Sequence, residues 1–418
     1  MKPQRISSEL LEVKKAQDII FSNFSKLDST EVSLIDAQNF VLSKDILAPF
    51  DLPEKDNSAM DGFAVQHKDI VEEKITELEV IGRVGAENRA EISLGKGQAI
   101  RIMTGGEIPK GSDCVVPFEN TNSGPMRGID YPKKVTINEA VNLGDNIRKS
   151  GLDYKKGSLV LKAGTLLNPP ALGVIASFGI NKLSVIRKPI ISVISTGNEV
   201  VMPGDDRKPG QIYDSNSFII SSAVKEAGGD VKLLDITGDR KEDIEAAISS
   251  CKESDLVISI GGVSKGDFDL IKDVLLEKGK INFWGINMKP GKPLTFGSLD
   301  LEDNNVFQLG LPGNPVSAYV CFELFVRPII LKMMGVNEIM RKKIKARITE
   351  DITNHDGRRM YVRVRIIEKK NEYIAEIYKN QNSNILSSLV FADGLAICPE
   401  DCKVVKSGDE LEVLLLRG

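Results

Sequence analysis

One segment of this chain combines a strand-like run with groups that bind anions and metal ions. Leu256–Ile260 is almost entirely apolar, and a glycine-rich loop follows it and ends at Asp269. Gly261 and Gly262 let the backbone approach a ligand and turn its N–H groups toward an anion. The loop also offers a hydroxyl, an ammonium and two carboxylates: Ser264, Lys265, Asp267 and Asp269. The carboxylates favour an anion that arrives with a divalent metal ion.

Two further loops follow apolar runs and carry groups of the same kind. The Ser-Thr-Gly run 195–197 is a candidate cradle for an oxyanion, and Glu199 is placed to meet a metal ion or a ligand hydroxyl. Pro312 and Pro315 fix φ and give the other loop a rigid rim. Open α/β sheets bind ligands at the C-terminal ends of parallel strands. If these strands are parallel, the three loops meet, and the sequence predicts a ligand site there.

More charged groups follow predicted strands of the same region. Asp239 is either a further acid at that edge or the N-cap of a helix that begins near 241. Lys289 and Lys292 flank a Pro-Gly turn, which holds them at a defined separation. A lysine ammonium is a compact point charge that suits phosphate, although such a turn is usually just solvated. These residues extend the candidate site by an acid and two cations.

Turns in the β-rich region carry polar groups of their own. Asp61 lies among small residues, Thr104 stands beside two glycines, and Asp153 follows an arginine and a glycine. Turn chemistry alone explains each of these segments equally well. Both interpretations stay open here: a second polar site and ordinary turns.

The composition is that of a multidomain globular protein. A length of 418 residues exceeds one ordinary domain, so we expect roughly two to four. The hydrophobic fraction of 41% and the net charge of −4 argue against nucleic acid or a membrane surface as the main partner. No apolar run approaches the roughly 20 residues that span a bilayer, and the N-terminus lacks the apolar core of a signal peptide. We expect a cytoplasmic location.

Cysteine and histidine usage narrows the chemistry. The five cysteines stand mostly in apolar contexts, which is typical of small core residues in a reducing compartment. Cys398 and Cys402 lack a second pair of ligands, so we expect no zinc site. With only two histidines, histidine-based general-base catalysis is disfavoured.

The periodicity of apolar residues divides the chain into regions of different predicted secondary structure. Residues 5–25 show helical periodicity, and short β-branched runs broken by Gly and Pro occupy 45–165. From about 180, strands and helices alternate, which predicts a doubly wound, mostly parallel sheet. The expected strands are 190–194, 231–236, 256–260, 282–286 and 306–309, and the expected helices are 215–228, 241–253, 268–279 and one that begins near Val316. Short strands return beyond 337.

We therefore expect an α/β fold combined with β-rich modules, in four domains. These are residues 1–48 with 151–178, an N-terminal helix and linking β domain; 49–150, a β-rich, insertion-like module; 179–333, the α/β domain; and 334–418, a small C-terminal β domain. Proline-bearing joints near 168–170 and 327 are candidate boundaries.

Eight motifs, in order along nearly the whole chain, resemble those of the molybdopterin molybdenumtransferase family, of the MoeA and gephyrin E-domain type. They are 56–62 (DNSAMDG), 103–105 (MTG), 146–153 (NIRKSGLD), 195–199 (STGNE), 212–216 (IYDSN), 261–269 (GGVSKGDFD), 289–293 (KPGKP) and 311–317 (LPGNPVS). The resemblance implies that the α/β domain is of the molybdopterin-binding type.

The resemblance also implies an activity and an assembly. The activity is insertion of molybdate into the dithiolene of adenylylated molybdopterin, with AMP released in a reaction that depends on Mg²⁺ or another divalent cation. The assembly is an elongated homodimer in which the α/β domain of one protomer faces the β-rich module of the other. Besides the pterin and oxyanion substrates, the implied partners are a molybdopterin adenylyltransferase and acceptor molybdoenzymes, in transient contact.

Site residues are carried over motif by motif. The catalytic residues that the resemblance implies are Asp61, Thr104, Asp153, Glu199, Asp239 and Asp269, with Glu199 and Asp269 as metal ligands. The implied substrate-binding residues are Ser195, Thr196, Gly197, Gly261, Gly262, Ser264, Lys289, Lys292, Pro312, Pro315, Arg358, Arg363 and Ser383. The last three form a basic and polar patch near the C-terminus. Lys265 and Asp267 lie outside the family match.

Two positions depart from the family pattern, and two other function classes stay open. Some bacterial members carry a lysine where this chain has Gly285, and a glycine often stands where it has Asn382. A non-catalytic scaffold is one alternative, but it has no need for the full set of acids. A related adenylyltransferase is the other, and the additional β domains favour the insertion step. Molybdate and tungstate are equally compatible with the sequence.

Overall fold

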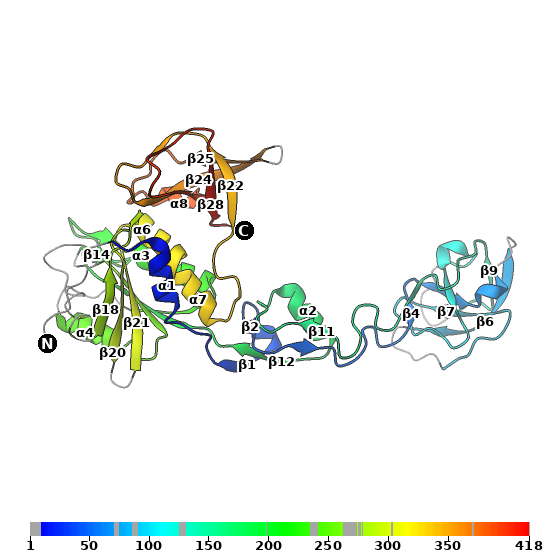
Figure 1. Ribbon diagram of the computed structural model, residues 1–418. Coiled ribbons are helices and arrows are strands. Elements are labelled where there is room, and N and C mark those ends of the chain that lie inside the picture. The colour runs from blue at the N-terminus through cyan, green and yellow to red at the C-terminus, as the bar shows by residue number, and fades with distance from the viewer. Residues whose placement is uncertain are drawn as a thin grey trace. The chain divides into compact units, whose positions relative to one another are not determined.

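The structure is a computed structural model that describes residues 10–70, 75–85, 91–124, 131–197, 199–234, 241–261, 274, 277, 279–301, 304–369 and 372–417. The chain divides into two compact units, which are coloured by residue number in Figure 1. Unit 1 comprises Met1–Ser43, Gly164–Asn168 and Lys182–Gly418, and unit 2 comprises Lys44–Ala163 and Pro169–Asn181. No helix among these described residues is long and apolar enough to cross a membrane.

The core of unit 1 is a six-stranded sheet in the order β16-β13-β17-β21-β20-β18. Its strands are Asp230–Leu233 (β16), Ile190–Ser195 (β13), Leu256–Ile260 (β17), Asn304–Leu311 (β21), Thr295–Leu301 (β20) and Gly279–Trp284 (β18). The first four run parallel, and β20 is antiparallel to both of its neighbours. Every residue of β17 is buried, as expected for a central strand covered on both faces. The predicted mostly parallel sheet is confirmed.

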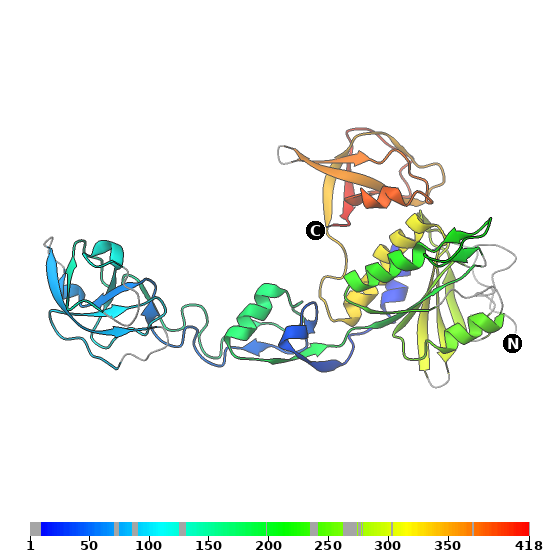
Figure 2. The ribbon, with the colours of Figure 1, turned by 180° about the vertical axis from the view of Figure 1, so that it is seen from behind.

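Helices cover both faces of this sheet (Figures 1 and 2). One face packs against α1 (Val13–Phe21), α3 (Asn216–Glu226), α6 (Pro315–Cys321) and α7 (Arg327–Met333), whose apolar side chains share a core with Val193 and Ile258. On the other face, α4 (Lys241–Ser249) packs against Ile194 and Val257. Alternate residues of β13 and β17 therefore point into opposite helical layers, as the period of a strand requires.

The C-terminal part of unit 1 is a second six-stranded sheet, in the order β19-β24-β25-β22-β28-β26, with an additional β24–β26 pairing. Its strands are Met288–Lys289 (β19), Arg359–Lys369 (β24), Glu372–Ile377 (β25), Lys343–Ile348 (β22), Glu410–Leu415 (β28) and Gly394–Cys398 (β26). This part also contains β23 (Ile352–Thr353), β27 (Val404–Val405) and α8 (Ser387–Val390). Because β19 belongs to the segment that leaves the central sheet after β18, this short strand ties the two sheets together.

Unit 2 is β-rich, as predicted. A five-stranded sheet consists of β8 (Cys114–Pro117), β5 (Gly62–Val65), β7 (Gln98–Ile102), β6 (Thr76–Val84) and β9 (Lys134–Ile137). Two short pairs are β4 (Asn57–Ser58) with β10 (Ile147–Arg148), and β3 (Ile46–Leu47) with β11 (Leu159–Leu161). Unit 2 also contains α2 (Pro169–Ser177), and unit 1 a small sheet of β1 (Ser29–Ser33), β12 (Lys182–Ile186) and β2 (Val41–Leu42).

Several expected element boundaries are wrong. The first helix spans Val13–Phe21 among the described residues, rather than 5–25. The helix expected over 268–279 lies largely outside the described residues, and its last position, Gly279, already begins β18. A Cβ on Gly279 would stand 1.9 Å from the Ser298 carbonyl oxygen, so the glycine serves close strand pairing. The antiparallel strand β20 is absent from the expected elements. The joint near 168–170 does fall at a boundary, because Asn168 ends a segment of unit 1 and Pro169 begins α2 in unit 2.

The proline near 327 does not mark a boundary, because the helix continues past it. Helix α6 passes into a π-helical turn, Phe322–Val326, and then into α7. Pro328 has no N–H to donate to the carbonyl of Leu324, four residues back. The buried side chain of Gln17 in α1 donates to that carbonyl, with Nε2 3.0 Å from the oxygen. Helix α1 thus satisfies a backbone group 307 residues away in sequence.

We expect Gln17→Met to lower the free energy of unfolding of unit 1 by about 1–3 kcal/mol, because the buried Leu324 carbonyl loses a donor. Urea unfolding, followed by the fluorescence of the single tryptophan, Trp284 in β18, measures this change. Asn23→Ala is the control, since Asn23 Nδ2 donates to Ile19 O in an exposed bond at the end of the same helix. Equal losses for the two variants would contradict this role of Gln17.

Candidate functional site

The three polar loops meet at the C-terminal edge of the central sheet. Strands β13, β17 and β21 are adjacent and parallel, so the loops after Ser195, Ile260 and Leu311 leave the sheet side by side. The Thr196 N–H donates to Ile260 O at 3.4 Å, and the Gly261 N–H donates to Leu311 O at 3.1 Å. These bonds join the described beginnings of the three loops, at the sheet edge where the sequence predicted that they converge.

Glycine is required at two points of this edge. Gly261 has a φ of +85°, and a Cβ there would stand 3.3 Å from Thr196 O. Gly197 has a φ of +136°, and a Cβ there would stand 2.8 Å from Oε2 of Glu199. The exposed Glu199 carboxylate therefore lies directly against the Gly197 backbone. Its own carbonyl accepts from the Ile212 N–H at 2.8 Å, where β14 (Val200–Val201) pairs with β15 (Ile212–Tyr213).

Other residues predicted for this edge cannot be compared with the structure. Outside the described residues lie Asp239, Gly262, Ser264, Lys265, Asp267 and Asp269. Their roles, including that of Asp269 as a metal ligand, stay predictions. Pro312 is buried and Pro315 is the first residue of α6, so these two prolines shape the loop backbone.

Three polar residues that were not among the predicted site residues lie beside these loops. Asn216 Nδ2 donates to Gly313 O at 2.7 Å, and Asp214 Oδ1 accepts from the Ser217 N–H at 3.0 Å. Asp214 Oδ2, Asn216 Oδ1 and Ser217 Oγ are buried, and no described group bonds to them. Most buried polar atoms have hydrogen-bond partners, so these three are candidates for contact with a ligand. The motif 212–216 was a signal for these residues, but sequence gave it no chemical role.

A pocket of about 370 Å³ lies where the two sheets of unit 1 meet. It is lined by the turn 289–293, by Asn314 and Ser317 at the start of α6, by Arg358 and 360–363 around the start of β24, and by 381–383. Its charged lining residues, among those described, are Lys289, Lys292, Arg358 and Arg363. All four are cations and no carboxylate is among them, so the pocket favours an anion.

The two lysines are presented by a tightly packed turn. Met288 and Lys289 pair in parallel with Arg359 and Met360 of β24. Gly291 follows with a φ of +101°, and a Cβ there would stand 2.7 Å from Cys321 Sγ and 2.8 Å from Met288 Cε. The backbone of the turn therefore packs closely against α6.

Arg363 forms the opposite wall of the pocket from inside the protein. Only 1% of its surface is exposed, and it donates to Ser388 Oγ at 2.9 Å. It also donates to Asn380 O and Asn382 O, at 3.1 and 3.2 Å. Burial lowers its pKa to about 10, which leaves it charged near neutral pH. Arg363 thus orders the segment that carries Ser383, whose carbonyl accepts from the Val316 N–H in α6 at 3.1 Å.

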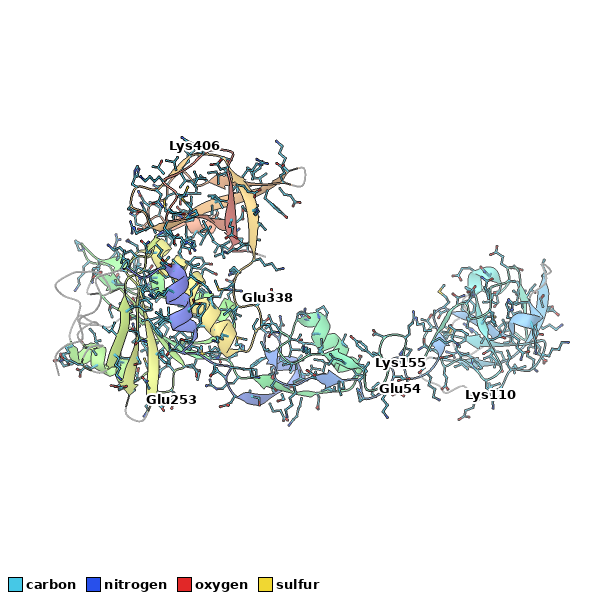
Figure 3. The ribbon with its side chains drawn as sticks, in the orientation of Figure 1. Glu54, Lys110, Lys155, Glu253, Glu338 and Lys406 are labelled. Atoms are coloured by element: carbon cyan, nitrogen blue, oxygen red, sulfur yellow. The ribbon has the colours of Figure 1, made fainter. Side chains whose placement is uncertain are left out.

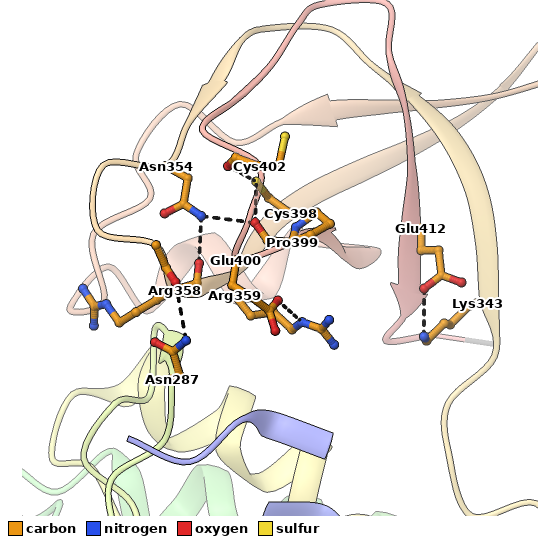
Figure 4. A network of polar contacts seen from close by, with 11 residues as sticks. Asn287, Lys343, Asn354, Arg358, Arg359, Cys398, Pro399, Glu400, Cys402 and Glu412 are labelled. Carbon is orange, nitrogen blue, oxygen red and sulfur yellow. Dashed lines mark hydrogen bonds and ion pairs between the residues drawn. The ribbon is translucent and has the colours of Figure 1, made fainter. Parts of the chain in front are cut away.

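Arg358 stands at the mouth of the pocket on a pinned loop. Asn354 Nδ2 donates to Arg358 O at 2.9 Å and to Pro399 O at 3.2 Å (Figure 4). The Arg358 guanidinium donates to Met288 O at 3.4 Å and forms an ion pair with Asp356. The side chain is 22% exposed, so part of it stays open to a ligand.

Unit 2 brings together two of the predicted catalytic residues. Asp61 Oδ1 accepts from the N–H and the hydroxyl of Thr104, at 2.6 and 2.7 Å. Gly105 N–H donates to Ser58 O at 2.9 Å, and the β4–β10 pairing adds the motif that begins at Asn146. Three motifs therefore form one cluster. Asp153 lies beyond β10, with its N–H bonded to Leu52 O at 2.9 Å.

Gly285 marks a real difference from members that carry a lysine there. It is buried with a φ of +94°, and a Cβ would stand 3.0 Å from Leu10 Cδ2. A lysine at this position would need the N-terminal segment to move. The described cations of the pocket come from the 289–293 turn and from β24 and the loop before it.

We expect Gly291→Ala to lower the free energy of unfolding of unit 1 by about 2–4 kcal/mol, through left-handed strain and overpacking against Cys321. Gly408→Ala is a matched control, because Gly408 has a φ of +93° with no heavy atom within 4 Å. That control should cost about 1–2 kcal/mol, from the backbone strain alone. Urea unfolding measures both, and losses of equal size would contradict the packing role of Gly291.

Comparison with known families assigns nearly the whole chain. Residues 11–179 match the MoeA N-terminal region (domain I and II), residues 192–332 match a probable molybdopterin binding domain, and residues 345–416 match the MoeA C-terminal region (domain IV).

Relatives and solved structures agree with this assignment. The molybdopterin molybdenumtransferase of Haemophilus influenzae is 34% identical over 385 residues, which cover 91% of this chain and 92% of the relative. That of Bacillus subtilis is 34% identical over 402 residues, covering 94% and 92%. The molybdopterin biosynthesis MoeA protein of Pyrococcus horikoshii superposes with a TM-score of 0.78 at 30% identity, over 97% of this chain and 100% of that one. The chain therefore belongs to the molybdopterin molybdenumtransferase (MoeA) family of enzymes.

Proposed function

We propose that this protein inserts molybdate into the dithiolene of adenylylated molybdopterin and releases AMP. Relatives along nearly the whole chain are named molybdopterin molybdenumtransferases. The observation that carries the proposal is the pocket whose four charged lining residues are all cations. An adenylylated pterin and molybdate are both strongly anionic, so such a pocket suits the substrates and the released AMP.

The pocket suits the phosphate part of the substrate. Its volume of about 370 Å³ is at the small end of ligand pockets, so it holds part of a dinucleotide-sized molecule. Lys289 and Lys292 supply mobile point charges, and Arg358 supplies a planar fork that can bind two phosphate oxygens. Asn314 and Ser317 add neutral hydrogen-bonding groups.

The sheet edge suits the pterin ring and the oxyanion. Asp214 Oδ2 and Asn216 Oδ1 are buried acceptors without partners among the described groups, and a pterin ring offers N–H donors. The glycine-rich loops at 195–197 and 261–262 are proposed to cradle an oxyanion with their backbone N–H groups. Ser195, Thr196 and Ser264 would add hydroxyls to the same cradle.

A divalent cation fits the acids of this edge. Mg²⁺ takes one or two carboxylates together with phosphate oxygens, and Glu199 is an exposed carboxylate at the edge of the central sheet. Glu199 and Asp269 would hold it, with Asp239 as a further acid nearby. Held there, the cation would supply neutralisation of the phosphate charge while water or molybdate forms a bond to the adenylyl phosphorus and the pterin phosphate leaves from it. Other divalent cations of similar ligand preference are compatible with this set.

We infer that the working form is a homodimer in which unit 2 of one protomer completes the pocket of the other. The pocket has cations but no carboxylate among its described lining residues, whereas Asp61 and Thr104 form a polar pair in unit 2. Asp61 orients the Thr104 hydroxyl, and Asp153 is a second acid of the same unit. Substrate arrival from an adenylyltransferase and cofactor transfer to acceptor molybdoenzymes are proposed as transient contacts.

Lys292→Gln should lower kcat/KM for AMP release about 10- to 100-fold, because a charge-assisted contact to the substrate phosphate is lost. The assay supplies purified protein with Mg²⁺, molybdate and adenylylated molybdopterin, and tungstate in parallel. Lys280→Gln, an exposed lysine of β18 that does not line the pocket, should leave the rate unchanged. Absence of AMP release by folded wild-type protein would refute the proposal, and AMP formation from ATP with free molybdopterin would favour an adenylyltransferase.

Mixing two inactive variants tests the shared site. In a heterodimer of Asp61→Asn with Lys292→Gln, one of the two composite sites is fully wild type and the other carries both substitutions. After subunit exchange we therefore expect about a quarter of wild-type turnover, since about half of the dimers are mixed. A site contained in one chain would give no recovery.

A further inference from the structure

One carboxylate stands next to the cationic pocket without lining it. Asp356 lies in the loop between β23 and β24, and its Oδ2 pairs with the Arg358 guanidinium. The same oxygen lies 3.8 Å from Lys289 Nζ. Asp356 therefore contacts two of the four cations that face the pocket.

The loop holds this carboxylate in place from both sides. Asn354 is buried, and besides bonding Arg358 O and Pro399 O it donates its own N–H to Lys403 O at 2.8 Å. Gly357 turns the chain with a φ of +65°. Asn287, from the segment that carries Lys289, reaches Gly357 O at 3.4 Å (Figure 4). The carboxylate is thus fixed between the loop and the lysine turn.

Asp356 is negatively charged, so it competes with any anion in the pocket for the same cations. The hydrogen bond from Arg358 holds the pKa of Asp356 below its usual value, so the side chain is ionised near neutral pH. A phosphate that binds Arg358 and Lys289 must share or displace these contacts. It must also approach a negative charge at close range.

We propose that Asp356 is a built-in counter-ion of the cationic pocket, which pairs Arg358 and Lys289 in the empty protein and lowers the affinity of the pocket for phosphate groups. The inference rests on the proposed function only in placing an anionic part of the substrate in this pocket. It assigns to Asp356 the task of easing the release of an anionic product. An alternative structural role, orientation of Arg358 for the ligand, predicts an effect of opposite sign.

Titration of the full-length protein with inorganic pyrophosphate by calorimetry at low ionic strength tests the proposal. Asp356→Asn should bind pyrophosphate about 3- to 10-fold more tightly than wild type, since two competing ion pairs and one repulsive charge are removed. The gain should shrink at high salt, where charge interactions are screened.

Asp351→Asn is the matched control. Asp351 is an exposed carboxylate of the same C-terminal sheet region and pairs with Lys406 at 2.8 Å, but it does not touch the pocket (Figure 3 labels Lys406). The control removes the same formal charge, so it should leave the pyrophosphate affinity within about twofold of wild type.

Every other outcome overturns the counter-ion role. Unchanged or weaker binding by Asp356→Asn indicates that the carboxylate positions Arg358 or does nothing for ligands. An equal gain in the Asp351→Asn control assigns the effect to net charge. Failure of both wild type and Asp356→Asn to bind pyrophosphate removes the pocket as an anion site. AMP release is not the readout, so a gain without AMP release would refute the proposed function and leave this inference intact.

Discussion

The pairing of β19 with β24 is the interaction on which the candidate site depends. Met288 and Lys289 leave the central sheet and add a short parallel strand to the C-terminal sheet, beside Arg359 and Met360. The turn that begins at Lys289 thereby places Lys289 and Lys292 in the lining of the same pocket as Arg358 and Arg363. Each backbone approach in this junction is close, as the contact of Gly291 with Cys321 shows. Without that pairing Lys289, Lys292 and Arg358 would be separate surface charges, which bind anions weakly.

Bringing cations together in this way costs desolvation free energy, and hydrogen bonds to surrounding polar groups offset part of that cost. Arg363 is almost fully buried, and burial lowers its pKa to about 10. Backbone carbonyls of Asn380 and Asn382 and the hydroxyl of Ser388 accept hydrogen bonds from it and stabilise its charged form. Those same bonds order the segment that carries Ser383. A charge that costs desolvation energy in the core is therefore also what gives the pocket a rigid wall.

Sequence patterns within short windows predicted the individual strands and helices, whereas contacts between distant segments determined the features that the sequence did not predict. Buried strands such as Leu256–Ile260 and the alternation around them were sufficient for the mostly parallel sheet and for the meeting of its loops. The sequence did not predict the strand β20, because β20 follows the lysine turn directly and no helix separates it from β18. The π-helical turn before α7 receives a hydrogen bond from Gln17, 307 residues away, which no window of sequence can contain. Likewise, the family resemblance pointed to Arg358, but only the folded loop shows its partner Asp356.

The cationic pocket and the neighbouring Asp356 carboxylate have opposite effects on an anion: the cations bind it, and the carboxylate favours its release. Four cations without any counter-charge would repel one another in the empty protein and would retain an anionic product. Tight binding of both substrate and product does not help a transferase, because interactions that are equally strong with the two do not speed the chemical step. Asp356 touches Arg358 and Lys289 but leaves Lys292 and Arg363 unpaired by it. Asp356 therefore contacts the two cations that must exchange partners when an anion binds, whereas Lys292 is exposed and Arg363 stays buried in the wall of the pocket.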